Sequence, residues 1–376
     1  MIISSYNVDG GVFVKNKVMD SPNWMFEAAS CITDLDQDRA EAVLENSSRF
    51  GMTREEMYEV LKDFIEYKKL VSAEIMPIYK DFRDLDKYFK ETNFTAEITN
   101  PVAPTLTMYF GSVFPSIDDK KTIDKVITEI IEDVISELSP FEDGKNIEIK
   151  SIEDILSLTN NISMEDSSKL ILIDLYYNRY KIYERLKTLL NLCAPICKKY
   201  FYIIQDEFSK TANLVKNTEN IQTLFQDNPS VKLNLVKESE IYIAIFFFNS
   251  FSIIEGQSGF LIYIGMYFFE YLKLRNKTRF DDTQVIADLK ALGDTTRLKI
   301  IHLLAQKKMY VQELSEALSL TPATVSHHIN TLLKSELITI TLDTERPKTI
   351  YYELNQGKIC DLGDTIKSLA GRTNNE

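Results

Sequence analysis

Apolar residues recur at helical spacing through most of the first 225 residues. They stand three or four positions apart, as one buried face of an amphipathic helix requires, in segments 57–65, 123–134 and 170–190. Thr53 followed three residues later by Glu56 has the spacing of a capping box and predicts the start of a helix. Ser21 followed by Pro22 predicts an earlier start, with Ser21 as the N-cap and Pro22 at the first helical position.

Two segments outside these helices have the composition of β-strands. Residues 1–20 alternate and contain Gly10–Gly11, which predicts a short strand or hairpin with its turn at the glycines. Residues 241–269 are rich in Ile, Phe and Tyr but are divided by EGQSG at 255–259. Each half is shorter than the roughly 18 residues that a membrane-spanning helix needs. This tract therefore predicts buried strands joined by hairpins rather than a membrane span.

The last quarter of the chain predicts three helices in quick succession. The first lies within 283–304 and is broken and recapped at Gly293–Asp294, and the second covers about 311–318. A three-residue turn leads to the third helix, 322–334, for which Thr321 is a natural N-cap. Two helices joined by so short a turn predict a helix-turn-helix.

Strand-like alternation follows the third helix directly. It occurs at 338–342 and again at 350–354, with a charged, proline-containing turn between them, so a β-hairpin completes a winged helix. The predicted fold is mainly α-helical with small β elements. Residues 1–275 form a large helical N-terminal domain with a small sheet, for effector binding or oligomerisation. Residues 276–282 form a charged linker, and residues 283–376 form the winged helix-turn-helix domain.

The distribution of charge bears on the partners of each segment. The formal charge is −13, which argues against binding nucleic acid or anionic membrane through bulk positive charge. The acidity lies in the first 281 residues, with 32 basic against 44 acidic residues, whereas the last 95 residues carry 11 against 12. The second segment is therefore nearly neutral, and any attraction for DNA must come from local groups of lysine and arginine.

Cysteine usage and the N-terminus predict the compartment. The four cysteines are too few and too scattered for a disulfide framework in a chain of this length. The first residues, MIISSYNVDGG, have neither a basic segment nor a continuous apolar core, so no secretory signal is predicted. We expect a cytoplasmic protein.

The last quarter of the chain resembles a known family. The segments LGDTTRLKIIHLL at 292–304, VQELSEALSLTPATVSHHINTLLKSELI at 311–338 and IYYEL at 350–354 are similar to the ArsR/SmtB class of winged-helix bacterial transcription regulators. The resemblance covers about 283–355 only. It implies a homodimer that binds an imperfect palindrome in double-stranded DNA and represses transcription until a signal releases it.

The candidate DNA-binding residues lie mainly on the third helix. Those of the recognition helix and its cap are Thr321, Pro322, Ala323, Thr324, Ser326, His327, His328 and Asn330. Small or hydrogen-bonding side chains on the outer face of such a helix can approach base edges in a major groove. The resemblance gives His327 the place of the variable base-contacting residue, and His328 that of the family's histidine, which either packs or touches DNA. Lys334, Arg346 and Lys348 are predicted to contact the DNA backbone, the last two from the hairpin tip.

A metal site and a cofactor are not predicted. Many members of the family bind thiophilic metals through a Cys-x-Cys in the second helix of the motif, but residues 311–315 contain no cysteine. Others bind zinc through the last helix, and residues 358–371 contain no histidine. Cys193 and Cys197 stand four positions apart, yet every histidine lies in the other domain, so we expect these cysteines to be small buried hydrophobes.

The resulting hypothesis is a DNA-binding transcription regulator, a repressor by resemblance, whose N-terminal domain senses a signal other than a metal ion, such as a small molecule. Two alternatives stay open for that domain: an oligomerisation or partner-binding scaffold, or an uncharacterised enzyme, with the winged helix used for protein interaction. No nucleophile elbow, phosphate-binding loop or HExxH sequence is present, so catalysis is not expected. Arg297 is expected to form a cap or ion pair within the winged helix.

Overall fold

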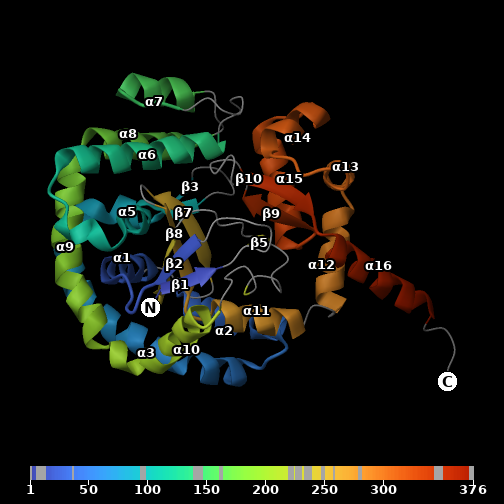
Figure 1. Ribbon diagram of the computed structural model, residues 1–376, viewed down its shortest axis with the longest axis horizontal. Helices are drawn as coiled ribbons and strands as arrows, with labels where there is room; N and C mark the ends of the chain where they lie inside the picture. Colours follow the sequence, from blue (N-terminus) through green and yellow to red (C-terminus); the bar gives the residue numbers. More distant parts are fainter. Residues whose placement is uncertain are drawn as a thin grey trace.

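The computed structural model describes residues 2–5, 14–35, 38–93, 99–138, 147–160, 164–218, 224, 231–232, 239–246, 250–256, 259–277, 282–342 and 350–371. Within these ranges the buried apolar side chains form one large cluster in the part of the chain before residue 278 and a separate one after residue 281. Figure 1 shows the elements of the second cluster at the right of the molecule, beside the larger helical part.

The first part contains most of the helices. They are α1 (Trp24–Asp34), α2 (Arg39–Glu45), α3 (Arg54–Tyr79), α4 (Asp86–Phe89), α5 (Val102–Phe110), α6 (Lys120–Leu138), α7 (Ile152–Thr159), α8 (Asp166–Tyr177), α9 (Arg179–Lys199), α10 (Gln205–Lys216) and α11 (Phe268–Lys277). Short 3₁₀ turns lie at Ser47–Phe50, Lys80–Leu85, Gly111–Ser116 and Phe201–Ile203. The strands are β1 (Ile2–Ser5), β2 (Val14–Val18), β3 (Glu91–Asn93), β4 (Thr99–Pro101), β5 (Val231–Lys232), β6 (Ser239–Ala244), β7 (Phe251–Gly256) and β8 (Gly259–Gly265).

The second part has the element order of a winged helix. Its elements are α12 (Asp282–Leu292), α13 (Thr295–Leu304), α14 (Val311–Leu318), α15 (Pro322–Lys334), β9 (Ile338–Leu342), β10 (Ile350–Leu354) and α16 (Gln356–Gly371). The predicted linker at 276–282 overlaps the ends of two helices, because α11 runs to Lys277 and α12 begins at Asp282.

A five-stranded sheet with the order β1-β2-β6-β8-β7 stands at the centre of the first part. Strands β2, β6 and β8 are parallel, and β1 and β7 are antiparallel edge strands. Both faces are buried, as parallel strands require. Ile241 and Ile262 belong to the large cluster, whereas Tyr242 and Tyr263 stack at 4.9 Å and belong to a smaller cluster that includes Phe26 of α1.

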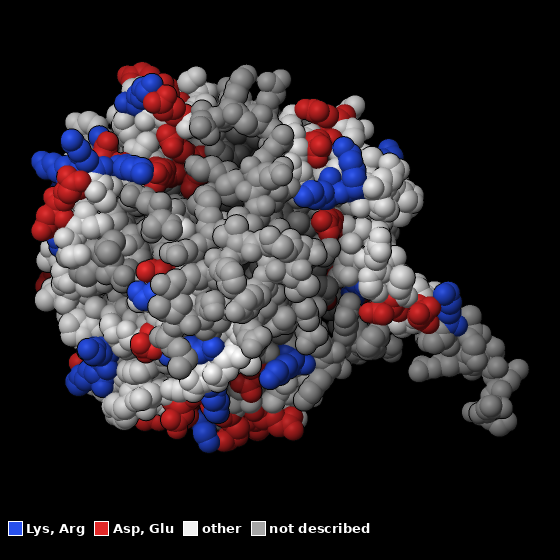
Figure 2. All heavy atoms as spheres, viewed as in Figure 1, with Lys and Arg blue, Asp and Glu red and all other residues white. Residues whose placement is uncertain are grey.

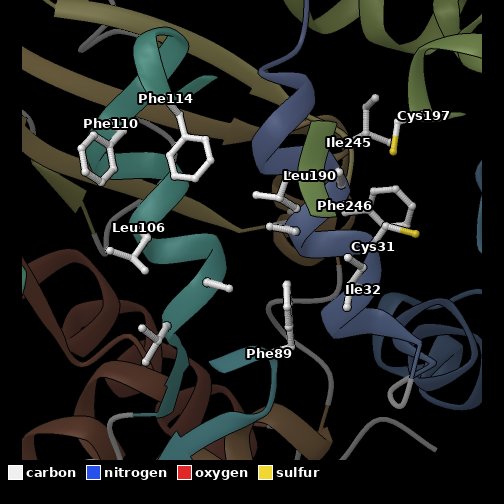
Figure 3. Close-up of a cluster of buried hydrophobic side chains, with 14 of the residues drawn as sticks. Cys31, Ile32, Phe89, Leu106, Phe110, Phe114, Leu190, Cys197, Ile245 and Phe246 are labelled. Carbon is white, nitrogen blue, oxygen red and sulfur yellow. The ribbon is translucent and has the colours of Figure 1, made fainter. Parts of the chain in front are cut away.

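The large cluster joins helices that are far apart in the sequence. Figure 3 shows Cys31 and Ile32 of α1 close to Cys197 of α9 and to Ile245 and Phe246, which follow β6. The prediction that Cys193 and Cys197 are buried is confirmed, and both are free thiols. Burial raises the pKa of the Cys193 thiol to about 12, so it is not a reactive thiolate at neutral pH.

Two acidic side chains of α1, Glu27 and Asp34, are buried in this part of the chain, and Asp34 pairs with Lys68 at 2.6 Å. Glu27 of α1 is fully buried, and its two carboxylate oxygens accept the backbone N–H groups of Ile245 and Phe246 at 2.9 and 3.0 Å. Burial raises the pKa of Glu27 to about 8, although the two N–H groups favour the ionised form. The contact fixes α1 against the carboxyl end of β6.

The helices and the first strands of this part follow the predictions from the sequence. The fold is mainly helical with small β elements, as predicted. The capping box is confirmed, because Glu56 N–H donates to Thr53 Oγ1 at 3.2 Å and Thr53 N–H donates to Glu56 Oε2 at 2.8 Å. Strands β1 and β2 pair antiparallel, as expected, while the predicted turn at Gly10–Gly11 lies outside the described residues.

Two predictions were wrong in detail. The N-cap of α1 is Asn23, not Ser21, because the Asn23 carboxamide both accepts from the Phe26 N–H at 3.3 Å and donates to the Tyr263 hydroxyl at 3.0 Å. Strands β7 and β8 form the expected hairpin, but β6 lies parallel to β8 and does not form a hairpin with β7. No helix within the described ranges is long and apolar enough to cross a membrane.

Candidate nucleic-acid interface

A short turn joins α14 to α15 and sets the angle between them. Ser319 ends α14 in the left-handed conformation, with φ of 55°, and the Leu320 N–H donates to the Ser315 carbonyl at 3.0 Å. Thr321 then caps α15, because its hydroxyl accepts from the Thr324 N–H at 3.2 Å. The helix-turn-helix predicted from the sequence is therefore present.

The inner face of α15 is anchored in the second core. Val325, Ile329 and Leu332 are almost completely buried and pack with Ile300 of α13 and Leu314 of α14. Since this face is fixed by packing, the opposite face of the helix is rigidly presented to its surroundings.

The opposite face is polar. Thr324, His327 and Lys334 are exposed, and Ser326 and Asn330 are half-buried. In a right-handed helix, positions 324, 327 and 334 fall along one side, so these side chains form one stripe about as long as the helix. Hydroxyl, imidazole and amino groups in such a stripe can donate to or accept from base edges and phosphates.

Of the remaining predicted DNA-binding residues, some lie in the first turn of α15 and others lie outside the described residues. Thr321 is exposed at the helix start and Pro322 is half-buried in the first turn. Ala323 lies in the same turn. Arg346 and Lys348 fall outside the described residues, and their predicted contacts stay predictions.

His328 faces the protein rather than the stripe. Its Nδ1 atom lies 3.6 Å from Asp294 Oδ1, and its side chain is only 14% exposed. Asp294 is the N-cap of α13 and accepts from the backbone N–H groups of Thr296 and Arg297 at 3.0 and 2.9 Å. The hydrogen bond from the Arg297 N–H, together with the positive charge of Arg297, holds the pKa of Asp294 below its ordinary value. His328 therefore lies between α15 and the start of α13, beside the Asp294 cap.

One member of the outer stripe was missed in the sequence. Thr331 is half-buried and donates its hydroxyl to the His327 carbonyl at 3.2 Å. It stands four residues after His327 and seven after Thr324, so helical spacing alone would have identified it.

Two further contacts make the scaffold behind α15 rigid. Arg297 caps the end of α12, because its guanidinium donates to the carbonyls of Ala291 and Lys290, the latter at 2.9 Å, as its predicted structural role requires. Lys358 of α16 pairs with Asp288 of α12 at 2.7 Å, and both side chains are at most 3% exposed. The helices that flank the motif are thus linked to each other by a buried ion pair.

Positive charge near the motif is dispersed. Lys307 lies 3.6 Å from Glu313, and Lys308 lies over the Tyr351 ring at 4.9 Å. On the face shown in Figure 2, basic and acidic side chains are interspersed among the described winged-helix residues instead of forming a continuous basic patch. Attraction for DNA phosphates would therefore come from a few separate lysines.

Metal ligands do not gather in this region. Among the described residues, no group of three or more His, Cys, Asp or Glu side chains is arranged to hold a metal ion. The first five residues of α14 have the sequence VQELS and contain no cysteine.

This geometry defines a protein with a winged helix-turn-helix whose second helix presents a polar face. Residues 294–339 match the family described as bacterial regulatory protein, arsR family. The chain belongs to this family.

Curated relatives agree with the match. The transcriptional repressor SdpR of Bacillus subtilis (strain 168) is 36% identical over 66 residues, which is 18% of this chain and 70% of that protein. The cadmium resistance transcriptional regulatory protein CadC of Listeria innocua is 33% identical over 84 residues, 22% of this chain and 68% of the relative. The arsenical resistance operon repressor of Staphylococcus aureus is 32% identical over 74 residues, which is 20% of this chain and 68% of that protein. About four fifths of this chain thus lies outside the similarity.

Proposed function

We propose that the chain represses transcription by placing α15 in the major groove of double-stranded DNA. The observation that carries this proposal is the division of α15 into a buried apolar face and a polar stripe that begins at a capped N-terminus. The positive end of the helix dipole at this N-terminus favours approach to phosphate. Membership of the arsR family, and three relatives named as regulators or repressors, support the same activity.

Band shifts on the DNA upstream of the gene test this directly. Wild-type protein is expected to form a specific complex at low salt that weakens as salt rises. The double variant Thr324→Glu/Ser326→Glu places two negative charges in the groove and is expected to lose the complex. A matched variant, Asn191→Glu/Asn213→Glu, adds the same charge on exposed positions of α9 and α10 and should keep it. Absence of a specific wild-type complex would contradict the proposal.

We infer that the DNA-bound form is a homodimer on an imperfect palindrome, since two-fold protein symmetry is matched by two half-sites. Exposed apolar side chains support this: Ile286 and Leu289 on α12, and Ile366, which continues the inward face of α16 past the end of the core. Light scattering should show a dimer for the wild type and a shift toward monomer for Ile286→Asp/Ile366→Asp. A monomeric wild type at micromolar concentration would contradict the inference.

We further propose two domains, divided at 276–282, with the N-terminal domain sensing a non-metal signal in the reducing cytoplasm. The two separate cores and the free, buried cysteines Cys31, Cys193 and Cys197 support this division and compartment. Thermal shift against a metabolite library tests it. A stabilising small molecule that also changes DNA affinity supports a sensor, whereas a constant dimer with no such ligand favours an oligomerisation or partner-binding scaffold.

A further inference from the structure

The sheet of the winged helix contains a strand from the other part of the chain. Strand β5 lies parallel to β9, with Val231 opposite Ile340 and Lys232 opposite Thr341, so the strand order is β10-β9-β5. The other edge of this sheet, strand β10, is paired within the winged helix itself. The Met309 N–H donates to the Tyr352 carbonyl at 3.0 Å, and the Tyr352 N–H donates to the Met309 carbonyl at 2.8 Å. Strand β5 thus covers the outer edge of β9, which would otherwise present unpaired backbone groups.

This pairing is the principal direct link between the two cores. Among the described elements it is the most extensive contact between the part of the chain before residue 278 and the part after residue 281. In Figure 1, β5 and β9 lie where the two parts face each other. The pairing of β5 with β9 is therefore a direct route by which a movement of the first part can reach the winged helix.

Only a few residues of the chain separate β5 from the central sheet of the first part. Lys232 is seven residues before Ser239, the first residue of β6 in the central sheet. Seven residues span at most about 25 Å even when fully extended. While β5 is paired, the outer edge of the wing is therefore held within that distance of the buried sheet.

The position of the pairing along β9 relates it to the predicted DNA contacts. Ile340 and Thr341 lie in the half of β9 that leads to the hairpin tip, where Arg346 and Lys348 are predicted to meet the DNA backbone. The part to which β5 belongs carries 44 acidic against 32 basic residues. Holding it close to the tip keeps net negative charge near the phosphates, which opposes binding.

We propose that the outer edge of β9 is an intramolecular docking site for Val231 and Lys232, through which the N-terminal part restrains the wing and lowers the affinity for DNA. The inference rests on the proposed DNA-binding function. A two-residue pairing is small enough to open and close reversibly, so a ligand or partner that favours the undocked arrangement would shift the population toward tighter DNA binding.

Amide hydrogen exchange tests the pairing without DNA. In Val231→Pro/Lys232→Pro both strand N–H groups are missing, whereas the matched Val231→Ala/Lys232→Ala removes the same side chains and keeps them. Because Tyr352 exchanges its backbone hydrogen bonds with Met309, its partner Ile340 directs its N–H toward β5, whereas the N–H of Thr341 is directed toward β10. The proline variant is expected to lose protection at Ile340 and keep it at Thr341, and the alanine variant to keep most of the protection at both. Equal protection of Ile340 in wild-type and proline variants would overturn the docking site.

Affinity for the upstream DNA tests the restraint. The proline variant is expected to bind at least threefold more tightly than wild type, with the alanine variant closer to wild type. If the proline variant loses amide protection but its Kd for DNA is unchanged or higher than that of wild type, the proposal that the N-terminal part lowers DNA affinity is overturned. If wild type and both variants fail to bind DNA, the proposed function is contradicted, while the exchange result still decides whether β5 docks.

A disulfide lock provides the opposite perturbation. Neighbouring strands place Cα partners about 4.8 Å apart, within the range that a disulfide spans, so Lys232→Cys/Thr341→Cys can be oxidised when β5 is docked. The background is Cys360→Ser, because Cys360 is exposed and the other cysteines are buried. Oxidised protein is expected to bind DNA at least threefold more weakly than the same protein reduced. Failure of the bond to form, or equal affinity once it has formed, would overturn the proposal.

Discussion

Both parts of the molecule bury an ion pair, Asp34 with Lys68 at 2.6 Å in the larger part and Asp288 with Lys358 in the winged helix, but the larger part also buries a carboxyl group that the described residues give no basic partner. In the winged helix, Asp288 and Lys358 form an ion pair at 2.7 Å between two helices, so each charge is balanced by its partner. In the larger part, Glu27 is buried with only backbone N–H groups as partners, and burial raises its pKa to about 8. The winged helix therefore depends on keeping both members of its pair, and the larger part depends in addition on the proton of the Glu27 carboxyl group.

Breaking the pair should have the largest effect. Lys358→Met leaves the carboxylate of Asp288 buried without its partner, which costs about 3–5 kcal/mol of unfolding free energy. The single tryptophan, Trp24, lies in α1, so its fluorescence reports on the larger part alone. Circular dichroism should therefore show an early transition in the variant while the fluorescence midpoint stays unchanged.

A matched change on the same helix provides the control. Lys367 pairs with Asp364 at 3.0 Å on the exposed surface of α16, so Lys367→Met should leave both transitions in place. If the fluorescence midpoint of Lys358→Met shifts together with the circular dichroism transition, the two cores unfold as one unit, which contradicts the prediction.

The single carboxyl should make the larger part sensitive to pH. Glu27 keeps its proton in the folded state up to about pH 8 but loses it near pH 4.3 when unfolded. The folded state therefore binds more protons between these values, and stability falls as pH rises, by at most about 1.4 kcal/mol per pH unit. Denaturant unfolding followed by Trp24 fluorescence at pH 6 and pH 8 measures this loss. The loss should be smaller in Glu27→Gln, and an equal loss in both proteins would count against the assignment.

Substitutions in the polar stripe of α15 test which side chains read bases and which contact phosphates. His327→Ala removes a predicted base contact and should reduce the preference for the specific site over scrambled DNA by about 1–3 kcal/mol. Lys334→Ala removes a predicted phosphate contact and should weaken both DNAs about equally. Competition binding on the two DNAs separates these outcomes, and equal effects of the two substitutions would show that α15 does not read bases.

Substitutions of helix N-caps should have the smallest effect on the free energy of unfolding, and each one tests a single part of the molecule. Thr321→Ala and Thr53→Ala each remove a hydroxyl that accepts a backbone N–H, at a cost of about 1 kcal/mol. The first should lower the stability of the winged helix, and the second that of the larger part. Trp24 fluorescence should respond only to Thr53→Ala, and a response to both would contradict separate unfolding.

Local signals made the winged helix predictable. Asp294 and Thr321 are N-caps whose partners lie two or three residues away, so they could be read from the sequence. The inward position of His328 was readable too, since it stands three residues after Val325 and four before Leu332 on the buried face. The family resemblance alone does not distinguish packing from DNA contact at this position, whereas helical phase does.

The larger part was less predictable because its decisive contacts are distant in sequence. Glu27 meets the end of β6 more than 200 residues later, and β5 meets β9 across more than 100 residues. The parallel pairing of β6 with β8 was likewise missed, since composition predicts strands but not their neighbours. A buried carboxylate on α1 has no local sequence signature that distinguishes it from a surface acid.

Hydrogen exchange of the full-length protein with and without its upstream DNA shows whether the winged helix contacts DNA through α15. We expect new protection concentrated in the peptides that cover α15 and its turn, with protection of the sheet and helices of the larger part unchanged. Protection confined to the larger part, or none at all under conditions where a complex forms, would contradict a contact through α15.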